Sequence, residues 1–474
     1  MTNITTDLDK LKILVVIASY GDKQIGYLKK VIETFKGMAP SVDVVVTSNN
    51  SKDLGKDVKV IVGVPSENPM SLPFAHKQVF ADNADRYDLF IYDEDDVLAP
   101  KSTVEAYLRA TRVLPEDQIA GHLRFEMNKA GKMCIPDIFG PYHWKPDSVK
   151  VHGEQVFAEF NNEHTGFYIL TQAQLKRAIK SGGYLREPYI GRYGMLETAA
   201  TDPFTSCGFK KVLCISHIDD FLVHHMPNKY AEKSGVLREV LDQQIAVMMS
   251  IQKWKHPVSS LCHLESKMPA GWWSKNFYEK PLEELIALAP PHAKSILSIG
   301  CGWGATEGAL KRNGTSVTAL PVDSIIGALA AQRGIEVIYE NLENGLKKLS
   351  GRKFDCVMVN EMLHLLPEPE WFMEKCLGLL NKGGTLLISG PNFSRLPFFV
   401  KRMIGHGNFG KLSSYKESGI NVCGPRTIGK LVKGAGLRVT AIKWINHQLP
   451  TRRLAKVQKE FGRLTAKDWI VQAK

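Results

Sequence analysis

The sequence lacks the features that mark several large classes of protein. No run of about 18 apolar residues occurs in its 474 residues, so we expect no transmembrane helix. The first residues have neither the basic region nor the long apolar region of a secretory signal. The eight cysteines are scattered and no two form a Cys-x-x-Cys pair, which argues against a disulfide scaffold and a thiolate zinc site. These absences favour a soluble protein of a reducing compartment, the cytoplasm.

Acidic residues are scarce in the last part of the chain. Between Arg395 and Lys474 there are 17 Lys and Arg residues against 3 Asp and Glu, although the formal net charge of the whole chain is +12. A basic region of this kind attracts anionic membranes, phosphates or nucleic acid. The sequence has no zinc finger, RNA-binding aromatic signature or basic zipper, so we expect no nucleic-acid partner. Two interpretations remain: a peripheral contact with the anionic inner face of a membrane, and a solvated basic surface that aids solubility.

Strand-like and helix-like segments alternate through the first half of the chain. The composition, 44% hydrophobic and 23% charged, is that of a globular protein, and the length suggests two or three domains. Buried strands are expected at Lys12–Ala18, Val42–Val46, Val58–Val62 and Asp88–Tyr92. Strands that alternate with helices indicate an α/β fold with a parallel sheet, whose ligands bind beyond the carboxyl ends of the strands.

A second series of strands and helices begins near residue 291. Its strands are expected at Ser295–Ile299, Ser316–Leu320, Glu336–Tyr339, Phe354–Val359, Thr385–Ser389, Arg438–Ile445 and Trp469–Gln472. Residues 251–290, between the two series, are rich in tryptophan and proline, and we interpret them as an ordered connector because flexible linkers are rarely aromatic. We therefore predict a first domain over residues 1–250, a connector over 251–290 and a second domain, with the basic region, over 291–474.

Four consecutive acids follow the last expected strand of the first series. Asp93, Glu94, Asp95 and Asp96 stand side by side, so their charges repel and each raises the pKa of its neighbours. A divalent cation removes this cost, and Mg²⁺ or Mn²⁺ prefers carboxylate oxygens and keeps positions open for phosphate. The cluster therefore predicts a metal site that holds a nucleotide-sugar diphosphate. The alternative is an exposed acidic turn that caps the next helix.

The segment around these acids, Asp88–Pro100, resembles the metal-binding strand end of GT-A glycosyltransferases. The order Glu94-Asp95-Asp96 is similar to the Glu-Asp-Asp motif of the N-acetylglucosaminyltransferase I type. The resemblance implies a GT-A (nucleotide-diphospho-sugar transferase) fold for residues 1–250. It also implies that Asp96 binds the metal and that Glu94 and Asp95 contact metal-bound waters or the ribose. Asp93 is an additional acid, so an Asp-x-Asp pair of Asp93 and Asp95 remains an alternative.

Two further acids are candidates for the catalytic base of such an enzyme. A transferase that inverts the anomeric carbon needs a carboxylate to deprotonate the acceptor hydroxyl. By its position relative to the fold, Glu197 is the first candidate and Asp202 the second, while capping of a helix N-terminus explains either acid equally well. Arg192 and Lys229 are candidates for neutralising a diphosphate leaving group.

The same resemblance implies a late histidine that contacts the metal or the pyrophosphate. His224 is the first candidate for this role and His225 the second, against the alternative of a histidine that only packs. Ser19 and Tyr20 follow the first expected strand and Asn49 follows the second. Their positions predict contacts with the base of the nucleotide.

The second half opens with a strand, a glycine loop and a helix. Gly300, Gly302 and Gly304 allow a tight turn and a close approach of the backbone to a nucleotide. Over nearly forty residues, Phe354–Asn392 resembles the central segment of class I S-adenosylmethionine-dependent methyltransferases, and most closely the ubiquinone-biosynthesis type. The resemblance implies a Rossmann-like fold that binds S-adenosylmethionine through these glycines.

Three positions differ from the pattern of that family. An acid usually begins the glycine motif, and Ser298 takes its place; the ribose-binding acid after the second strand is replaced by Pro321, with Asp323 two residues further. Asn341 stands where an acid usually contacts the adenine, and an amide still accepts a hydrogen bond. His364 is a candidate base or substrate contact. These differences leave open a degenerate domain kept for packing or acceptor docking.

The two halves together predict a bifunctional enzyme of cell-surface polysaccharide or glycolipid synthesis. One half would transfer a sugar from a nucleotide-sugar donor to a glycan or lipid-linked glycan with the help of Mn²⁺ or Mg²⁺. The other would methylate a hydroxyl of the same glycan. A glycosyltransferase with an inactive second domain, a carbohydrate-binding scaffold without activity, and a plain methyltransferase of a small molecule or RNA are the alternatives.

Overall fold

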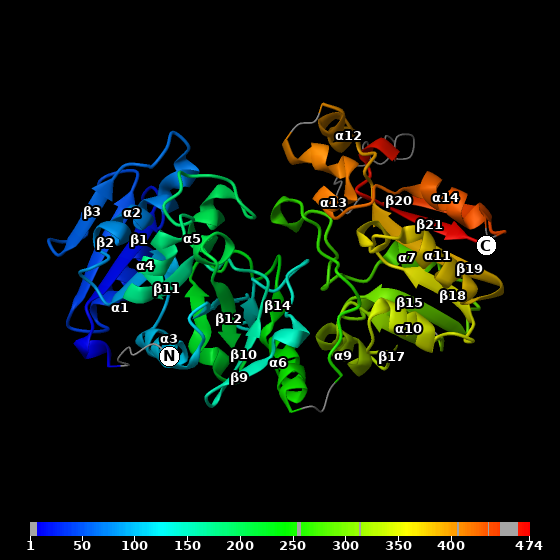
Figure 1. Cartoon of the computed structure of the whole chain (residues 1–474), viewed down its shortest axis with the longest axis horizontal. Helices are drawn as coiled ribbons and strands as arrows, with labels where there is room; N and C mark the ends of the chain where they lie inside the picture. The colour runs from blue at the N-terminus through cyan, green and yellow to red at the C-terminus, as the bar shows by residue number, and fades with distance from the viewer. Residues whose placement is uncertain (1–6, 254–256, 312–313, 405–406, 435, 446–462) are drawn as a thin grey trace. The chain divides into compact units, whose positions relative to one another are not determined.

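The chain divides into two compact units, Met1–Lys255 and His256–Lys474, which are described separately below. The computed structural model describes residues 7–253, 257–311, 314–404, 407–434, 436–445 and 463–474 (Figure 1). Over these residues, no helix is both long enough and apolar enough to cross a membrane.

The first unit is built on a five-stranded sheet with the order β11-β4-β1-β2-β3 (Figure 1). Its strands are β1 (Ile13–Ser19), β2 (Val42–Ser48), β3 (Val58–Val62), β4 (Leu89–Glu94) and β11 (Phe167–Thr171). The first four are parallel, and β11 pairs antiparallel with β4. All seven residues of β1 are buried, because helices and loops cover both faces of a parallel sheet and the strand is therefore apolar throughout.

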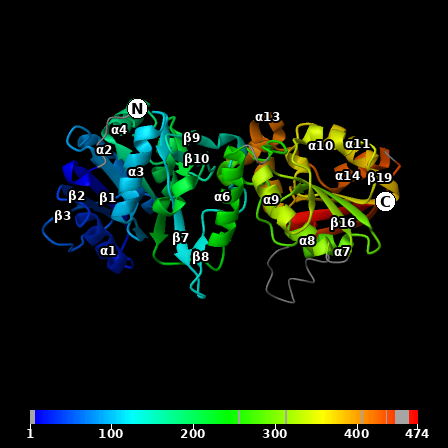
Figure 2. The same cartoon turned by 90° about the horizontal axis from the view of Figure 1, so that it is seen from below.

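Helices and smaller sheets complete the first unit. The helices are α1 (Ile25–Lys36), α2 (Ala75–Asp82), α3 (Lys101–Val113), α4 (Gln172–Lys180), α5 (Met195–Thr205) and α6 (Arg238–Gln252). One small sheet has the order β6-β12-β10-β9, formed by Gln118–Ala120, Lys210–Cys214, Gln155–Glu159 and Lys150–His152. In Figure 2, α6 runs beside β8 (Met133–Ile135) of the remaining sheet.

That remaining sheet connects the acid cluster with the end of the unit. Its order is β14-β8-β7-β13-β5, formed by Val236–Leu237, Met133–Ile135, Leu123–Met127, Leu222–His225 and Val97–Leu98. Strand β5 begins directly after Asp96, and its residue Val97 pairs with His225 of β13. The pairing therefore brings a histidine beside the acids although about 130 residues of chain separate them.

The second unit contains a seven-stranded sheet with the order β17-β16-β15-β18-β19-β21-β20. The strands are β15 (Ser295–Cys301), β16 (Ser316–Pro321), β17 (Glu336–Val337), β18 (Phe354–Val359), β19 (Leu380–Pro391), β20 (Val439–Ile445) and β21 (Asp468–Ala473). All pairs are parallel except those that β21 makes. The strand order reverses at β15, between β16 and β18, which is where an open α/β sheet forms its ligand crevice.

Helices follow the parallel strands of this sheet. They are α7 (Glu283–Leu288), α8 (Ala305–Lys311), α9 (Ser324–Gln332), α10 (Leu342–Lys348), α11 (Pro369–Gly378), α12 (Leu396–Met403), α13 (Tyr415–Ser418) and α14 (Pro425–Gly434). The N-termini of α8, α9 and α10 lie just beyond β15, β16 and β17, so they face the carboxyl edge of the sheet. The glycine loop thus stands at the reversal point.

Residues 257–281, part of the segment we interpret as a connector, pack on the second unit. The backbone N–H of Leu261 donates to the carbonyl of Val322 at 2.9 Å, and the N–H of Trp303 donates to the carbonyl of Phe277 at 3.1 Å. Leu261 and Phe277 are buried. The segment therefore runs along the loops that follow β15 and β16, where the predicted cofactor site lies.

Candidate functional site

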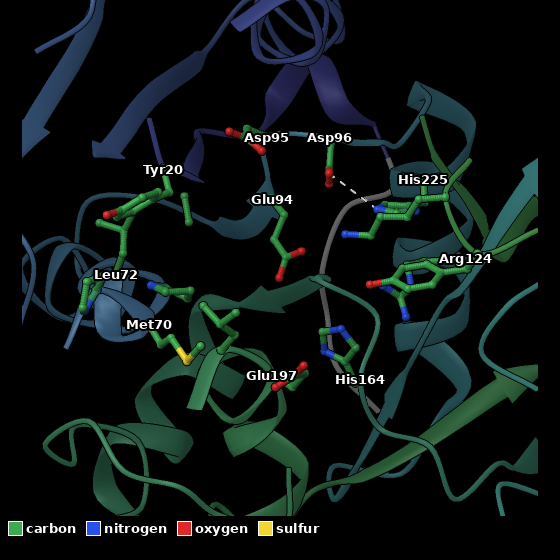
Figure 3. A pocket seen from close by; sticks show the side chains of 16 residues that line it. Tyr20, Met70, Leu72, Glu94, Asp95, Asp96, Arg124, His164, Glu197 and His225 are labelled. Atoms are coloured by element: carbon green, nitrogen blue, oxygen red, sulfur yellow. Dashed lines mark ion pairs between the residues drawn. The ribbon is translucent and has the colours of Figure 1, made fainter. Parts of the chain in front are cut away.

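A cavity of about 420 Å³ lies at the carboxyl ends of β1 and β4 in the first unit (Figure 3). Its apolar lining comes from the 3-10 helix before α2 and from Leu196 of α5, and its polar lining consists of acids and several cations. The lining residues are Ala18, Tyr20, Pro69, Met70, Leu72, Pro73, Glu94, Asp95, Asp96, Arg124, His164, Leu196, Glu197, His225, Lys229 and Tyr230. The structure therefore gathers most of the residues predicted for nucleotide-sugar binding in one place.

The acid cluster at this cavity is buried, not an exposed turn. Burial, together with the charge of neighbouring acids, raises the pKa of Glu94 to about 7 and that of Asp95 to about 6. The pKa of Asp93, which burial and Glu94 raise, lies well above its usual range. One carboxylate oxygen of Asp93 and one of Asp95 have no hydrogen-bond partner among the described residues. Such a cluster needs either protons or a cation to be stable.

Asp96 is the acid that contacts other side chains of the site. Its Oδ2 accepts a hydrogen bond from Gln24 Nε2 at 2.7 Å and lies 3.5 Å from His225 Nε2. His225 Nδ1 is 2.5 Å from Glu126 Oε1, so the imidazole lies between two carboxylates. Although burial opposes protonation, Asp96 and Glu126 together raise the pKa of His225 above its ordinary value.

The histidine we placed first, His224, points away from the acids. Successive side chains of a strand lie on opposite faces, and in β13 His224 stacks on Phe125 with ring centroids 4.7 Å apart. Its Nε2 is 3.3 Å from Asn228 Oδ1. His225, our second candidate, is the one whose ring reaches Asp96.

No ready-made metal site is present in the part of the chain that the structure describes. No three side chains of His, Cys, Asp or Glu are arranged there to hold a metal ion. The donors that fit a hard cation are the oxygens of Asp96 and Asp95, with His225 beside them. Their burial and the unpartnered oxygen of Asp95 are compatible with Mn²⁺ or Mg²⁺, which stays a prediction.

The two candidate bases lie in different surroundings. Glu197, in the first turn of α5, lines the cavity opposite Glu94, and His164 is drawn beside it (Figure 3). Asp202 is fully buried on the same helix, where it pairs with Lys77 and accepts a hydrogen bond from Tyr189 at 2.6 Å. The contacts of Asp202 are those of a structural ion pair, and only Glu197 opens on the cavity.

Sequence reasoning missed His164 as a lining residue. Its side chain is partly buried, its Nδ1 is enclosed and has no hydrogen-bond partner among the described residues, and burial lowers its pKa well below the usual range. His164 belongs to the segment 160–168 after a strand, but no sequence feature distinguishes it from the other histidines. Its neutral imidazole offers the cavity a hydrogen-bonding group without charge.

The residues predicted for the nucleotide base are only partly brought together. Tyr20 lines the cavity and is 55% exposed, which leaves its ring free to stack on a planar ligand. Ser19 is buried and bonds to Asp95. Asn49 accepts a hydrogen bond from the N–H of Gly21 at 2.7 Å and so shapes the turn after β1. Lys229 lines the cavity, whereas Arg192 pairs with Glu163 at 2.9 Å.

In the second unit, the glycine loop is packed so closely that side chains are excluded. Gly300 and Gly304 both have φ near +80°, a conformation that favours glycine. A Cβ atom at Gly300 would lie 2.6 Å from Met362 Sδ, and one at Gly302 would lie 2.7 Å from the carbonyl oxygen of Phe277. The close packing and the backbone conformation therefore require glycine at these positions.

The polar residues predicted around this loop serve as helix caps or pack in the interior. Asp323 Oδ1 accepts from the N–H of Ile326 at 2.7 Å and caps α9, and Asn341 Oδ1 accepts from the N–H of Asn344 at 2.8 Å and caps α10. Burial raises the pKa of Asp323 to about 7, and its Oδ2 has no hydrogen-bond partner within the described ranges. Ser298 is buried and donates to Glu307 at 2.6 Å. Pro321 is the last residue of β16, which extends one residue beyond the expected strand.

His364 lies buried next to the carboxyl edge of the same sheet. Its Nε2 is 2.7 Å from the carbonyl oxygen of Trp273, so Nε2 carries the proton and Nδ1 keeps the lone pair. Nδ1 has no hydrogen-bond partner in the described part of the chain. Burial lowers the pKa of His364 to about 4, which leaves the ring neutral and makes Nδ1 a hydrogen-bond acceptor.

Comparison with known proteins decides the nature of this part of the second unit. Residues 272–442 match the family model described as a methyltransferase domain. Residues 272–442 form a class I methyltransferase domain. The ubiquinone biosynthesis O-methyltransferase of Xylella fastidiosa (strain 9a5c) is 26% identical over 210 residues, which cover 40% of this chain and 81% of that protein. The corresponding protein of Histophilus somni (strain 2336) is 29% identical over 146 residues, or 27% of this chain and 60% of that protein.

Solved structures of methyltransferases are also similar to the methyltransferase domain. A SAM-dependent methyltransferase from Archaeoglobus fulgidus matches with a TM-score of 0.31 and 17% identity over 41% of this chain and 90% of its own. The N-methyltransferase NodS from Bradyrhizobium japonicum WM9, in complex with S-adenosyl-L-homocysteine, matches with a TM-score of 0.28 and 18% identity over 40% of this chain and 83% of its own. The match of residues 272–442 to the methyltransferase family model confirms the expectation of a Rossmann-like methyltransferase fold for that part of the chain.

Proposed function

We propose that the protein is a bifunctional transferase that adds a sugar to a glycan and methylates a hydroxyl of that glycan. The observation that carries the methyl transfer is the match of residues 272–442 to a methyltransferase domain, whose glycine loop stands at the reversal point of the sheet. The Xylella relative is named as an O-methyltransferase, which favours oxygen as the acceptor atom.

The residues of the methyltransferase domain fit S-adenosylmethionine as the cofactor. Gly300, Gly302 and Gly304 offer backbone groups at close range, while Asp323 offers an unpartnered carboxylate oxygen for the ribose hydroxyls. The bound cofactor supplies an electrophilic methyl group. His364, neutral and with no hydrogen-bond partner at Nδ1 among the described residues, accepts a hydrogen bond from the acceptor hydroxyl and orients it, and the proton released on methyl transfer passes to water.

The cavity of the first unit supports a sugar transfer assisted by a divalent cation. Asp96 and Asp95 would hold Mn²⁺ or Mg²⁺, which neutralises the diphosphate that leaves from a nucleotide-sugar donor. Lys229, which also lines the cavity, adds a positive charge for that diphosphate. Glu197, on the opposite side of the cavity, takes the proton of the acceptor hydroxyl.

Ligand-dependent stabilisation of the full chain tests both halves of the proposal. We expect S-adenosylmethionine alone to raise the melting temperature, and Mn²⁺ with one member of a nucleotide-sugar panel to raise it further. Stabilisation by the donor and metal alone would mean that the methyltransferase domain is degenerate. Stabilisation by neither at millimolar concentration would contradict both activities and favour a carbohydrate-binding scaffold.

The glycan acceptor we propose is lipid-linked, and α12 is the element that supports a peripheral membrane contact. None of its residues is buried; Leu396, Phe399 and Met403 are each at least half exposed, and Lys401 and Arg402 lie among them. Apolar and basic side chains on one short helix suit an anionic bilayer surface. Sedimentation with vesicles of phosphatidylglycerol, compared with vesicles of phosphatidylcholine, tests this contact, and equal binding to both would contradict it.

A further inference from the structure

Two buried polar side chains flank the glycine loop of the second unit. Ser298 is fully buried in β15, and Glu307, in the first turn of α8, is 1% exposed. Ser298 Oγ donates a hydrogen bond to Glu307 Oε1 at 2.6 Å. The other carboxylate oxygen, Oε2, is buried and has no hydrogen-bond partner among the described residues. A buried carboxylate oxygen without a hydrogen-bond partner lowers the stability of the folded state, so we expect it to bind a ligand or to serve another function.

The charge of Glu307 is not balanced by an ion pair in the part of the chain that the structure describes. The nearby buried cation, Lys275, donates to Glu279 Oε2 at 2.8 Å. Glu279 accepts a second hydrogen bond from Asn360 Nδ2 at 2.5 Å, so Lys275 and Glu279 form a satisfied pair. Glu307 acts on Lys275 only through its electrostatic field, as a lesser contribution to the raised pKa of that lysine. The carboxylate of Glu307 therefore keeps its attraction for a further cation.

The chemistry that fits this place is the methionyl end of S-adenosylmethionine. That end carries an ammonium group and a sulfonium group, and Glu307 follows the glycine loop by three residues. A charge-assisted hydrogen bond in a buried site is among the stronger polar interactions that a protein offers. The family pattern places an acid at this position, where the chain has Ser298, and the structure shows that Ser298 holds a carboxylate from α8.

We propose that Glu307, held by Ser298, is a cofactor-binding residue whose carboxylate binds the cationic methionyl end of S-adenosylmethionine. The acid missing from β15 is thereby replaced by one from the following helix. This inference rests on the proposed methyltransferase function.

The test is titration calorimetry of the full chain with S-adenosylmethionine and with S-adenosylhomocysteine. Glu307→Gln keeps the shape of the side chain but removes its charge, and should weaken binding of S-adenosylmethionine about 10- to 100-fold. The double variant Ser298→Asp/Glu307→Gln moves the acid to the strand and should recover most of the loss. Glu374→Gln, an exposed acid on α11, is the matched control and should bind like the wild type.

The two ligands identify the group that Glu307 contacts. S-adenosylhomocysteine keeps the amino group and lacks the sulfonium charge, so weakening for both ligands indicates the amino group. Weakening for S-adenosylmethionine alone indicates the sulfonium.

The outcomes that contradict the inference differ from those that contradict the proposed function. A wild-type protein that binds neither ligand overturns the proposed function and this inference with it. Wild-type binding that Glu307→Gln leaves unchanged overturns the inference alone and gives Glu307 a packing role. If Glu307→Gln does not fold, Ser298→Ala decides, because it removes the partner that holds the carboxylate. It should weaken binding about threefold to tenfold, and unchanged affinity would again overturn the inference.

Discussion

The two candidate sites place their acids at the edge of a parallel sheet in different ways. In the first unit, Asp93 and Glu94 end strand β4 and Asp95 and Asp96 follow it directly, and burial raises the pKa of each of the first three. In the second unit, the acids stand singly in the helices after the strands, and Asp323 caps α9. Concentrated carboxylates demand a divalent cation, whereas separate ones suit an organic cofactor with one cation and several hydroxyls.

The largest effect is expected from substitution of the acid that would hold the metal. Asp96→Asn should abolish stabilisation by Mn²⁺ and lower metal-dependent sugar transfer on the order of 1000-fold, because the leaving diphosphate loses its counter-ion. Melting curves with and without Mn²⁺, and transfer assays with the stabilising donor, measure both. The control is Asp219→Asn, an exposed acid that pairs with Arg238. If Mn²⁺ stabilises Asp96→Asn as much as the wild type, Asp96 does not hold a metal ion.

The second prediction separates the two acids of α5. Asp202→Asn leaves Lys77 buried without a counter-ion and should lower the free energy of unfolding by about 3–5 kcal/mol in urea titrations. Glu197→Gln, on the cavity side, should change stability little and should remove sugar transfer. If instead Glu197→Gln destabilises the fold and Asp202→Asn abolishes transfer without loss of stability, the assignment of the base must be exchanged.

The sequence predicted the strands of the two large sheets and the acid cluster because these depend on local patterns, but the strand ends were less accurate, since β4 runs on to Glu94 and β19 begins at Leu380. Continuous apolar runs predicted β1 and β15, and each site lies beyond such a strand. The choice between His224 and His225 was different, since it depends on the phase of a four-residue strand, and an error of one residue reverses the face.

Contacts between residues that depend on tertiary packing could not be predicted from local sequence patterns. The pairing of Asp202 with Lys77 joins residues 125 positions apart, and no local pattern encodes it. The contact of Ser298 with Glu307 spans only nine residues, yet it depends on how α8 packs against β15. A serine in place of an acid indicated loss of function, whereas the structure shows a nearby carboxylate.

The third prediction uses pH to test the buried charge of the first unit. The pKa of Glu94 is raised from 4.5 to about 7, so the folded state binds its proton more tightly than the unfolded state. Without metal, this residue contributes stability that is present below about pH 4.5 and is lost as the pH rises through about 7, on the order of 3 kcal/mol. Comparison of wild type and Glu94→Gln by urea unfolding between pH 5 and 8 isolates this contribution. If the free energies of unfolding of the two proteins change in parallel with pH over this range, the prediction is contradicted. Addition of Mn²⁺ should restore the stability of the wild type at pH 8.

The smallest effect concerns the single acids of the second unit. Asp323→Asn keeps an oxygen that can cap α9 and removes the charge, so it should leave the melting temperature nearly unchanged and weaken S-adenosylmethionine binding about tenfold. Because burial raises the pKa of Asp323 to about 7, wild-type affinity should increase as the pH rises through 7, and the affinity of the variant should not. The converse change, Asn341→Asp, also keeps a helix cap and should tighten binding threefold to tenfold if an acid there contacts the adenine. Calorimetry at pH 6 and pH 8 measures all of these. A loss of affinity in Asp323→Asn that is equal at both pH values would show that its amide disturbs packing and that the charge of Asp323 is not what binds the ribose.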